Sequence, residues 1–168
     1  MALTTLMTIP VNTHVNGELS CRSLAVPNST IDNLAVSPSA DIEATKSIQQ
    51  RHKNYSQASA ATATAARLVL STVYGDTGTI VAFRAGTVTP CTGNATITVD
   101  LYVNGSTVLN AVITLDNANT AYQLEAATIL TDTLVENDVM EIVVAVNAGT
   151  GVLGLGLFVE LLTHEDPA

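Results

Sequence analysis

Short apolar segments alternate with turn signals through the second part of the chain, from Asn54 onward. Eight segments are rich in Val, Ile, Thr and Leu and show the period-two alternation of half-buried strands. They span residues 53–57, 65–74, 78–88, 95–103, 107–115, 121–129, 138–147 and 152–163. Clusters of Gly, Asn, Asp and Pro separate them, and no helix-length pattern intervenes, which excludes parallel βαβ units. The pattern predicts an all-β fold, an eight-stranded antiparallel sandwich or barrel.

The alternation also assigns inward faces to three of these strands. The residues expected to point inward are Ala95, Ile97, Val99, Leu101 and Val103; Met140, Ile142, Val144 and Val146; and Leu153, Leu155, Leu157, Val159 and Leu161.

The connection after the fourth predicted strand allows two registers. A two-residue Asn104-Gly105 turn would pair residue 101 with residue 108 and bring Asn110 into the core. A three-residue loop, 103–105, would pair residue 101 with residue 107 and keep Asn110 outside. We prefer the three-residue loop because strand register follows the apolar pattern.

Two glycines lie on the opposite face of the last predicted strand, Gly154 and Gly156, followed on that face by Phe158. Glycine weakens a strand unless the chain bends there or another backbone comes close. Two interpretations stay open: a bend or bulge within the subunit, or a subunit contact over Gly154, Gly156 and Phe158. The residues after this strand, 164–168, are expected to form a solvated tail.

The first part of the chain lacks this strand pattern. Residues 1–52 carry Pro10, Pro27 and Pro38 and no sustained helical stripe, so we expect an extended arm before a β domain at 53–168. Its isolated apolar side chains cannot offset the entropy of ordering so long a segment. The arm is therefore a flexible linker, or it docks on another polypeptide or twines with copies of itself. The regular spacing of the apolar residues favours docking or twining. The docking residues would be Leu3, Leu6, Ile9, Val11, Leu19, Leu24, Ile31, Leu34, Val36 and Ile42.

Charge is distributed unevenly and limits the partners. The net charge is −9, and all six Lys and Arg residues lie in the first 84 positions, whereas positions 85–168 hold ten Asp and Glu. Such an acidic β domain is unsuited to nucleic acid or to anionic membranes. No apolar run approaches the roughly 18 residues of a membrane span, and the N-terminus has no signal-peptide pattern. We expect no nucleic-acid or membrane partner, and synthesis in a cytosol.

The sequence contains no pattern typical of an active site. It has no G-x-S-x-G, and the G-x-G-x-x-G at residues 149–154 leads into a strand instead of a helix, which leaves no helix N-terminus for a phosphate. Cys21, Cys91 and three scattered His match no zinc spacing. We therefore expect no catalytic residue, no metal and no cofactor, and a protein that is not an enzyme.

Several segments resemble a pattern in virion proteins of tailed bacteriophages, in which an I-x-N … A-x-I-x-A-T/S-K stretch precedes a compact β domain. Here the stretch reads Ile31-Asp32-Asn33 and then Ala40-Asp41-Ile42-Glu43-Ala44-Thr45-Lys46. Similar text follows at residues 17–20, 24–27, 78–81, 85–90, 97–101, 104–109 and 154–158, so the resemblance covers most of residues 17–163.

The resemblance implies a fold and a role. The fold would be an eight-stranded antiparallel jelly-roll-like sandwich preceded by an extended N-terminal arm. The protein would be a capsid decoration (cement) protein on the virion head surface, made in the host cytoplasm. It would bind the major capsid protein through the arm and form a homotrimer. The alternative is a head-fibre or tail-fibre module whose β domain binds a host surface glycan.

Overall fold

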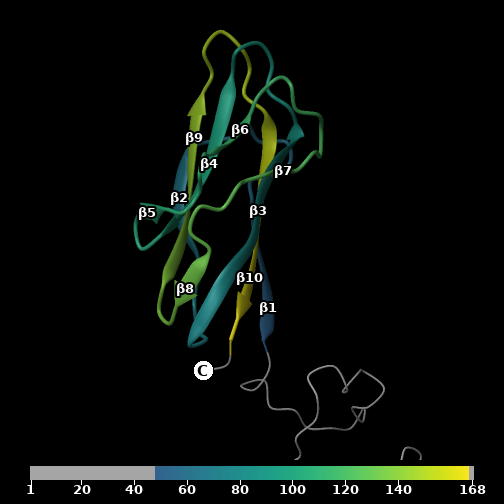
Figure 1. Ribbon diagram of the computed structural model, residues 1–168. Coiled ribbons are helices and arrows are strands. Elements are labelled where there is room, and N and C mark those ends of the chain that lie inside the picture. The colour runs from purple at the N-terminus through teal and green to yellow at the C-terminus, as the bar shows by residue number, and fades with distance from the viewer. Residues whose placement is uncertain (1–47, 167–168) are drawn as a thin grey trace, which may run out of the picture. The chain divides into compact units, whose positions relative to one another are not determined.

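The computed structural model describes residues 48–166, which form ten strands in two antiparallel sheets (Figure 1). Sheet A has the order β1-β10-β3-β7, and β8 also pairs with β3. Its strands are β1 Gln49–Ser56, β3 Thr77–Thr89, β7 Glu125–Ala126, β8 Thr133–Val135 and β10 Leu155–Glu165. Sheet B has the order β2-β9-β4-β5, and β6 also pairs with β4. Its strands are β2 Ala66–Thr72, β4 Thr96–Val103, β5 Ser106–Thr107, β6 Ile113–Leu115 and β9 Val139–Asn147.

The predicted all-β class is confirmed, whereas the predicted strand count is wrong. Six of the eight predicted segments correspond to the long strands β1, β2, β3, β4, β9 and β10, although β1 begins at Gln49, four residues earlier than predicted. The segment 107–115 splits into β5 and β6, and the segment 121–129 keeps only the two residues of β7. The short strand β8 was not predicted, because three residues are too few for alternation to be recognised.

The core lies between the two sheets, and the alternating residues fill it. Ile97, Val99 and Leu101 of β4 are fully buried, as are Met140 and Ile142 of β9 on the same sheet. Sheet A supplies the facing residues, among them Phe83, Leu157, Val159 and Leu161. Four residues near the ends of the predicted inward sets are only half-buried, namely Val103, Val146, Leu153 and Leu155. Burying one apolar face of each sheet is the main source of stability in such an arrangement.

One extra residue in β3 keeps its apolar side chains on the core side. Leu162 of β10 lies opposite Ala82, but Thr163 lies opposite Ile80, which leaves Val81 as a bulge. The bulge changes the phase of the alternation, so that both Ile80 and Phe83 are buried although they are three positions apart.

The turn between β4 and β5 corrects the preferred register. Val103 pairs with Ser106, and both Asn104 and Gly105 have positive φ angles, 49° and 83°. This is the two-residue Asn-Gly turn, whose twist matches that of the flanking strands. Asn110 nevertheless stays exposed, because the ladder stops after Thr107 and pairing with β4 resumes only at Ile113.

Asp138 holds this turn against the β8–β9 loop. Its Oδ1 accepts a hydrogen bond of 2.6 Å from Nδ2 of Asn104, and its Oδ2 accepts one of 2.8 Å from the backbone N–H of Val135. The Asn104 side chain in turn accepts a hydrogen bond from the backbone N–H of Val139 at 2.9 Å. Asp138 itself is buried, whereas Asn104 and Val135, which donate to it, are exposed residues. Loss of the carboxylate would remove both hydrogen bonds that tie the turn to the loop.

We expect Asp138→Ala to lower the free energy of unfolding by about 1–3 kcal/mol, because the two hydrogen bonds that its carboxylate accepts are lost. Urea denaturation followed by circular dichroism measures the loss. Asp132→Ala is the matched control, since Asp132 is exposed and its carboxylate has no hydrogen bond or ion pair with the described residues. Equal losses in the two variants would contradict the role assigned to Asp138.

Candidate functional site

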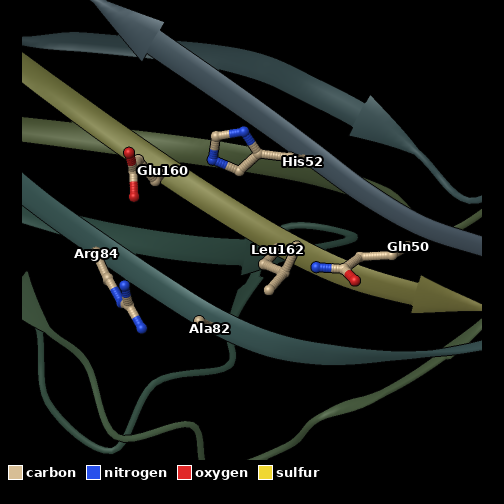
Figure 2. A pocket seen from close by; sticks show the side chains of 6 residues that line it. All are labelled: Gln50, His52, Ala82, Arg84, Glu160 and Leu162. Carbon is tan, nitrogen blue, oxygen red and sulfur yellow. The ribbon is translucent and has the colours of Figure 1, made fainter.

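A hollow of about 230 Å³ lies on the outward face of sheet A (Figure 2). Three neighbouring strands line it: β1 with Gln50 and His52, β3 with Ala82 and Arg84, and β10 with Glu160 and Leu162. The intervening residues of these strands, such as Phe83 and Leu161, point into the core. Alternation therefore places the six lining residues on the opposite face.

The polar groups around the hollow do not neutralise one another. Arg84 lies directly across from Glu160 in the β3–β10 ladder, the arrangement in which opposite charges usually pair. Yet neither side chain makes an ion pair or hydrogen bond with the residues of the described range, and Figure 2 shows the two charged groups directed apart. Gln50 and His52 likewise have no side-chain hydrogen bond within 48–166. Four polar side chains thus face the hollow, open to solvent and without a side-chain partner among residues 48–166.

Sheet B shows the contrasting arrangement on its own outward face. Arg67 of β2 binds Glu141 of β9 through two hydrogen bonds, Nε to Oε1 at 3.3 Å and Nη2 to Oε2 at 2.8 Å. The guanidinium also lies 5.3 Å from the ring centroid of Tyr102. The side-chain hydrogen bond from Arg67 lowers the pKa of Glu141 and raises the pKa of Arg67. We call the Arg67–Glu141 pair closed, because its two side chains bind each other, and the Arg84–Glu160 pair open, because its two side chains do not.

The expectation of a solvated tail is wrong at its beginning. β10 continues through Glu165, which is only 1% exposed. Its Oε2 accepts hydrogen bonds from the backbone N–H groups of Tyr74 and Gly75, at 3.1 and 3.2 Å, and lies 3.0 Å from Nε of Arg51. This carboxylate joins the end of β10 to the start of β1 and to the β2–β3 connection, which is a structural role.

The backbone that comes close to the two glycines belongs to the same chain. Gly156 has a φ of +62°, and a Cβ there would lie 2.7 Å from Cα of Ser59 and 2.8 Å from Cγ2 of Val88. Gly156 donates a backbone hydrogen bond to Ala61, and Gly154 accepts one, both at 2.9 Å.

Phe158 also has a contact within its own chain. It lies opposite Gly86, and a Cβ at Gly86 would come 2.7 Å from Cζ of Phe158, so the ring covers that glycine. The predicted subunit contact of Gly154, Gly156 and Phe158 concerns a second copy of the chain and stays a prediction.

The predicted arm residues, Leu3 to Ile42, lie outside the described residues. The lining of the hollow was not predicted from the sequence. Its only sequence signal is a polar residue at every second position of a strand, as at Gln50 and His52. That signal is common to all solvated sheet faces, and only the order of the strands brings the six residues together.

Within residues 48–166, no group of three or more His, Cys, Asp or Glu is placed to hold a metal ion. No helix in that range is long and apolar enough to cross a membrane. Cys91 is a free, buried thiol that accepts a hydrogen bond from the backbone N–H of Gly154 at 3.2 Å, and Cys21 lies outside the described residues.

Comparisons of the chain with known proteins give matches only among solved structures. No protein-family model matches the chain, and no curated protein matches it. Among solved structures, a chain of the "Capsid of Ralstonia phage GP4" is similar, with 15% sequence identity and a TM-score of 0.48. The match covers 81% of this chain and 94% of that chain.

We expect Gly156→Ala to lower the free energy of unfolding by roughly 2–5 kcal/mol, because it combines a strained left-handed conformation with contact against Ser59 and Val88. Gly105→Ala is the matched control: its φ is +83°, but nothing lies within 4 Å of the added Cβ. The control should lose only about 1–2 kcal/mol. Urea denaturation of both variants checks the difference, and equal losses would show that the close backbone approach at Gly156 has no energetic weight.

Proposed function

We propose that the protein is a structural component of a bacteriophage virion, a capsid decoration protein that binds the assembled head shell as a homotrimer. The resemblance of residues 17–163 to tailed-phage virion proteins supports the class. The observation that carries the proposal is the difference in sequence pattern between the first part of the chain and the β domain. An arm with ten isolated apolar side chains precedes β1, the edge strand of a sandwich whose two sheets supply a continuous apolar core.

The order of the strands supports a jelly roll as the fold of the β domain. When β5 and β6 are taken as one position and β7 and β8 as another, eight positions result. Successive positions mostly alternate between the two sheets. The order of positions is 1-8-3-6 in sheet A and 2-7-4-5 in sheet B. Two four-position antiparallel sheets connected in this way are the pattern of a double Greek key.

The mechanism follows from linkage between binding and assembly. A protein that binds the assembled shell but not the free subunits stabilises the shell by mass action. In a homotrimer, three arms would act together, so modest contacts of single arms with the major capsid protein would add up to stable attachment. The acidic β domain would keep densely placed copies soluble on the head surface.

Removal of residues 1–47 tests the role of the arm, because the cut leaves β1 complete from Gln49. We expect the truncated protein to remain a folded trimer, since the core lies between the sheets, and to lose binding to shells by about 100-fold or more as the arms no longer act together. Light scattering measures the trimer, and sedimentation with purified undecorated shells measures the binding.

A full-length variant with Leu24→Ser, Ile31→Ser and Leu34→Ser serves as the matched control for chain length. It should lose shell binding like the truncated protein, because the proposed contact is apolar. Decoration at full occupancy by the truncated protein would refute the role of the arm. Failure of the truncated protein to fold would show instead that the arm completes its own subunit.

One observation favours a second candidate, a head-fibre or tail-fibre module that binds a host surface glycan. It is the hollow on sheet A, whose polar side chains have no partners among residues 48–166.

A further inference from the structure

We propose that the hollow on sheet A is a binding site for one uncharged saccharide unit. The site goes beyond the decoration role, since it lies in the β domain and does not involve the arm. It also gives the second candidate function a specific location, so that the two functions are tested by separate measurements.

The chemistry of the lining fits a ligand rich in hydroxyl groups. Gln50 offers an amide, Arg84 a guanidinium with several donors in one plane, and Glu160 a carboxylate that accepts. A sugar ring presents hydroxyl groups that both donate and accept, and it can use all three groups at once. Ala82 and Leu162 supply an apolar floor against which the C–H face of a ring packs.

The open Arg84–Glu160 pair is the strongest sign that the site is built for a ligand. The two residues are directly opposite on β3 and β10 and carry opposite charges, yet they do not bond. On sheet B the same two residue types, Arg67 and Glu141, close into a bidentate pair although they are not directly opposite in the ladder. A hydroxyl-rich ring between Arg84 and Glu160 would accept from one and donate to the other.

The charge of the lining favours a neutral ligand over a charged one. The hollow holds one permanent cation, Arg84, and one carboxylate, Glu160. An acidic sugar would be attracted by Arg84 but repelled by Glu160. A cationic ligand would be attracted by Glu160 but repelled by Arg84. His52 would add a donor or an acceptor without deciding the sign.

The size of the hollow sets the expected affinity. Pockets for drug-sized ligands have about 300–1,000 Å³, so a hollow of about 230 Å³ suits a single sugar ring. A ligand of this size on an open sheet face should bind with a Kd on the order of millimolar. Copies of the site in a homotrimer would strengthen attachment to a surface that repeats the same sugar.

Saturation-transfer NMR on the full-length protein tests the proposal, with methyl glycosides of a neutral hexose, an N-acetylhexosamine and a hexuronic acid as probes. We expect saturable binding of at least one neutral glycoside and weaker binding of the hexuronic acid. Arg84→Ala and Glu160→Gln should each reduce the affinity about tenfold or more. The first removes the guanidinium donors, and the second replaces a charged acceptor by a weaker neutral amide.

The matched controls are Arg67→Ala and Glu141→Gln, the same residue types on the outward face of sheet B. They should leave saccharide binding unchanged. Absence of saturable binding by all three probes would refute the site, as would an equal loss in the sheet B controls. Preference for the hexuronic acid, abolished only by Arg84→Ala, would show a simple anion contact and also overturn the proposal.

Sedimentation with shells separates this inference from the decoration role. Arg84→Ala and Glu160→Gln should bind shells like the unmodified protein, since the arm is intact. Loss of shell binding in these two variants, with no saccharide binding by the unmodified protein, would show that the hollow is a contact for the capsid and not a sugar site.

Discussion

The mutual burial of two apolar sheet faces is the constraint on which the rest of the structure depends. Neither sheet could stand alone in water, because each exposes a row of Val, Ile and Leu side chains on one face. Packed together, they form one core that includes Phe83 and Leu161 from sheet A and Ile97 and Met140 from sheet B. Every connection in the described chain has to keep these side chains on the inner side.

The irregular features of the strands serve this same constraint. The bulge at Val81 restores the phase of β3, so that Ile80 and Phe83 both reach the core. Pairing with β4 is interrupted between β5 and β6, which lets Val108 and Leu109 be buried together while Asn110 remains in solvent. In each case a local loss of backbone pairing is accepted because the apolar face is kept whole.

The outward faces are free of that constraint, and there the two sheets differ. Sheet B closes its charged residues into the Arg67–Glu141 pair, whereas sheet A leaves Arg84 and Glu160 open above a small apolar floor. Two parts of the chain carry the proposed functions. The arm is proposed to attach the protein to a shell, and the outward face of sheet A is proposed to bind a small neutral ligand. The core contributes the rigid frame that holds the outward face of sheet A.

The sequence by itself determined the fold class, the six long strands and most of the inward side chains, because strand alternation is a local property of the chain. It could not determine the register at Asn104-Gly105, the bulge at Val81 or the short strands, which depend on what lies across the ladder. The hollow could not be predicted from the sequence for the same reason. Its lining comes from positions near 50, 82 and 160, and only the tertiary structure places β1, β10 and β3 side by side.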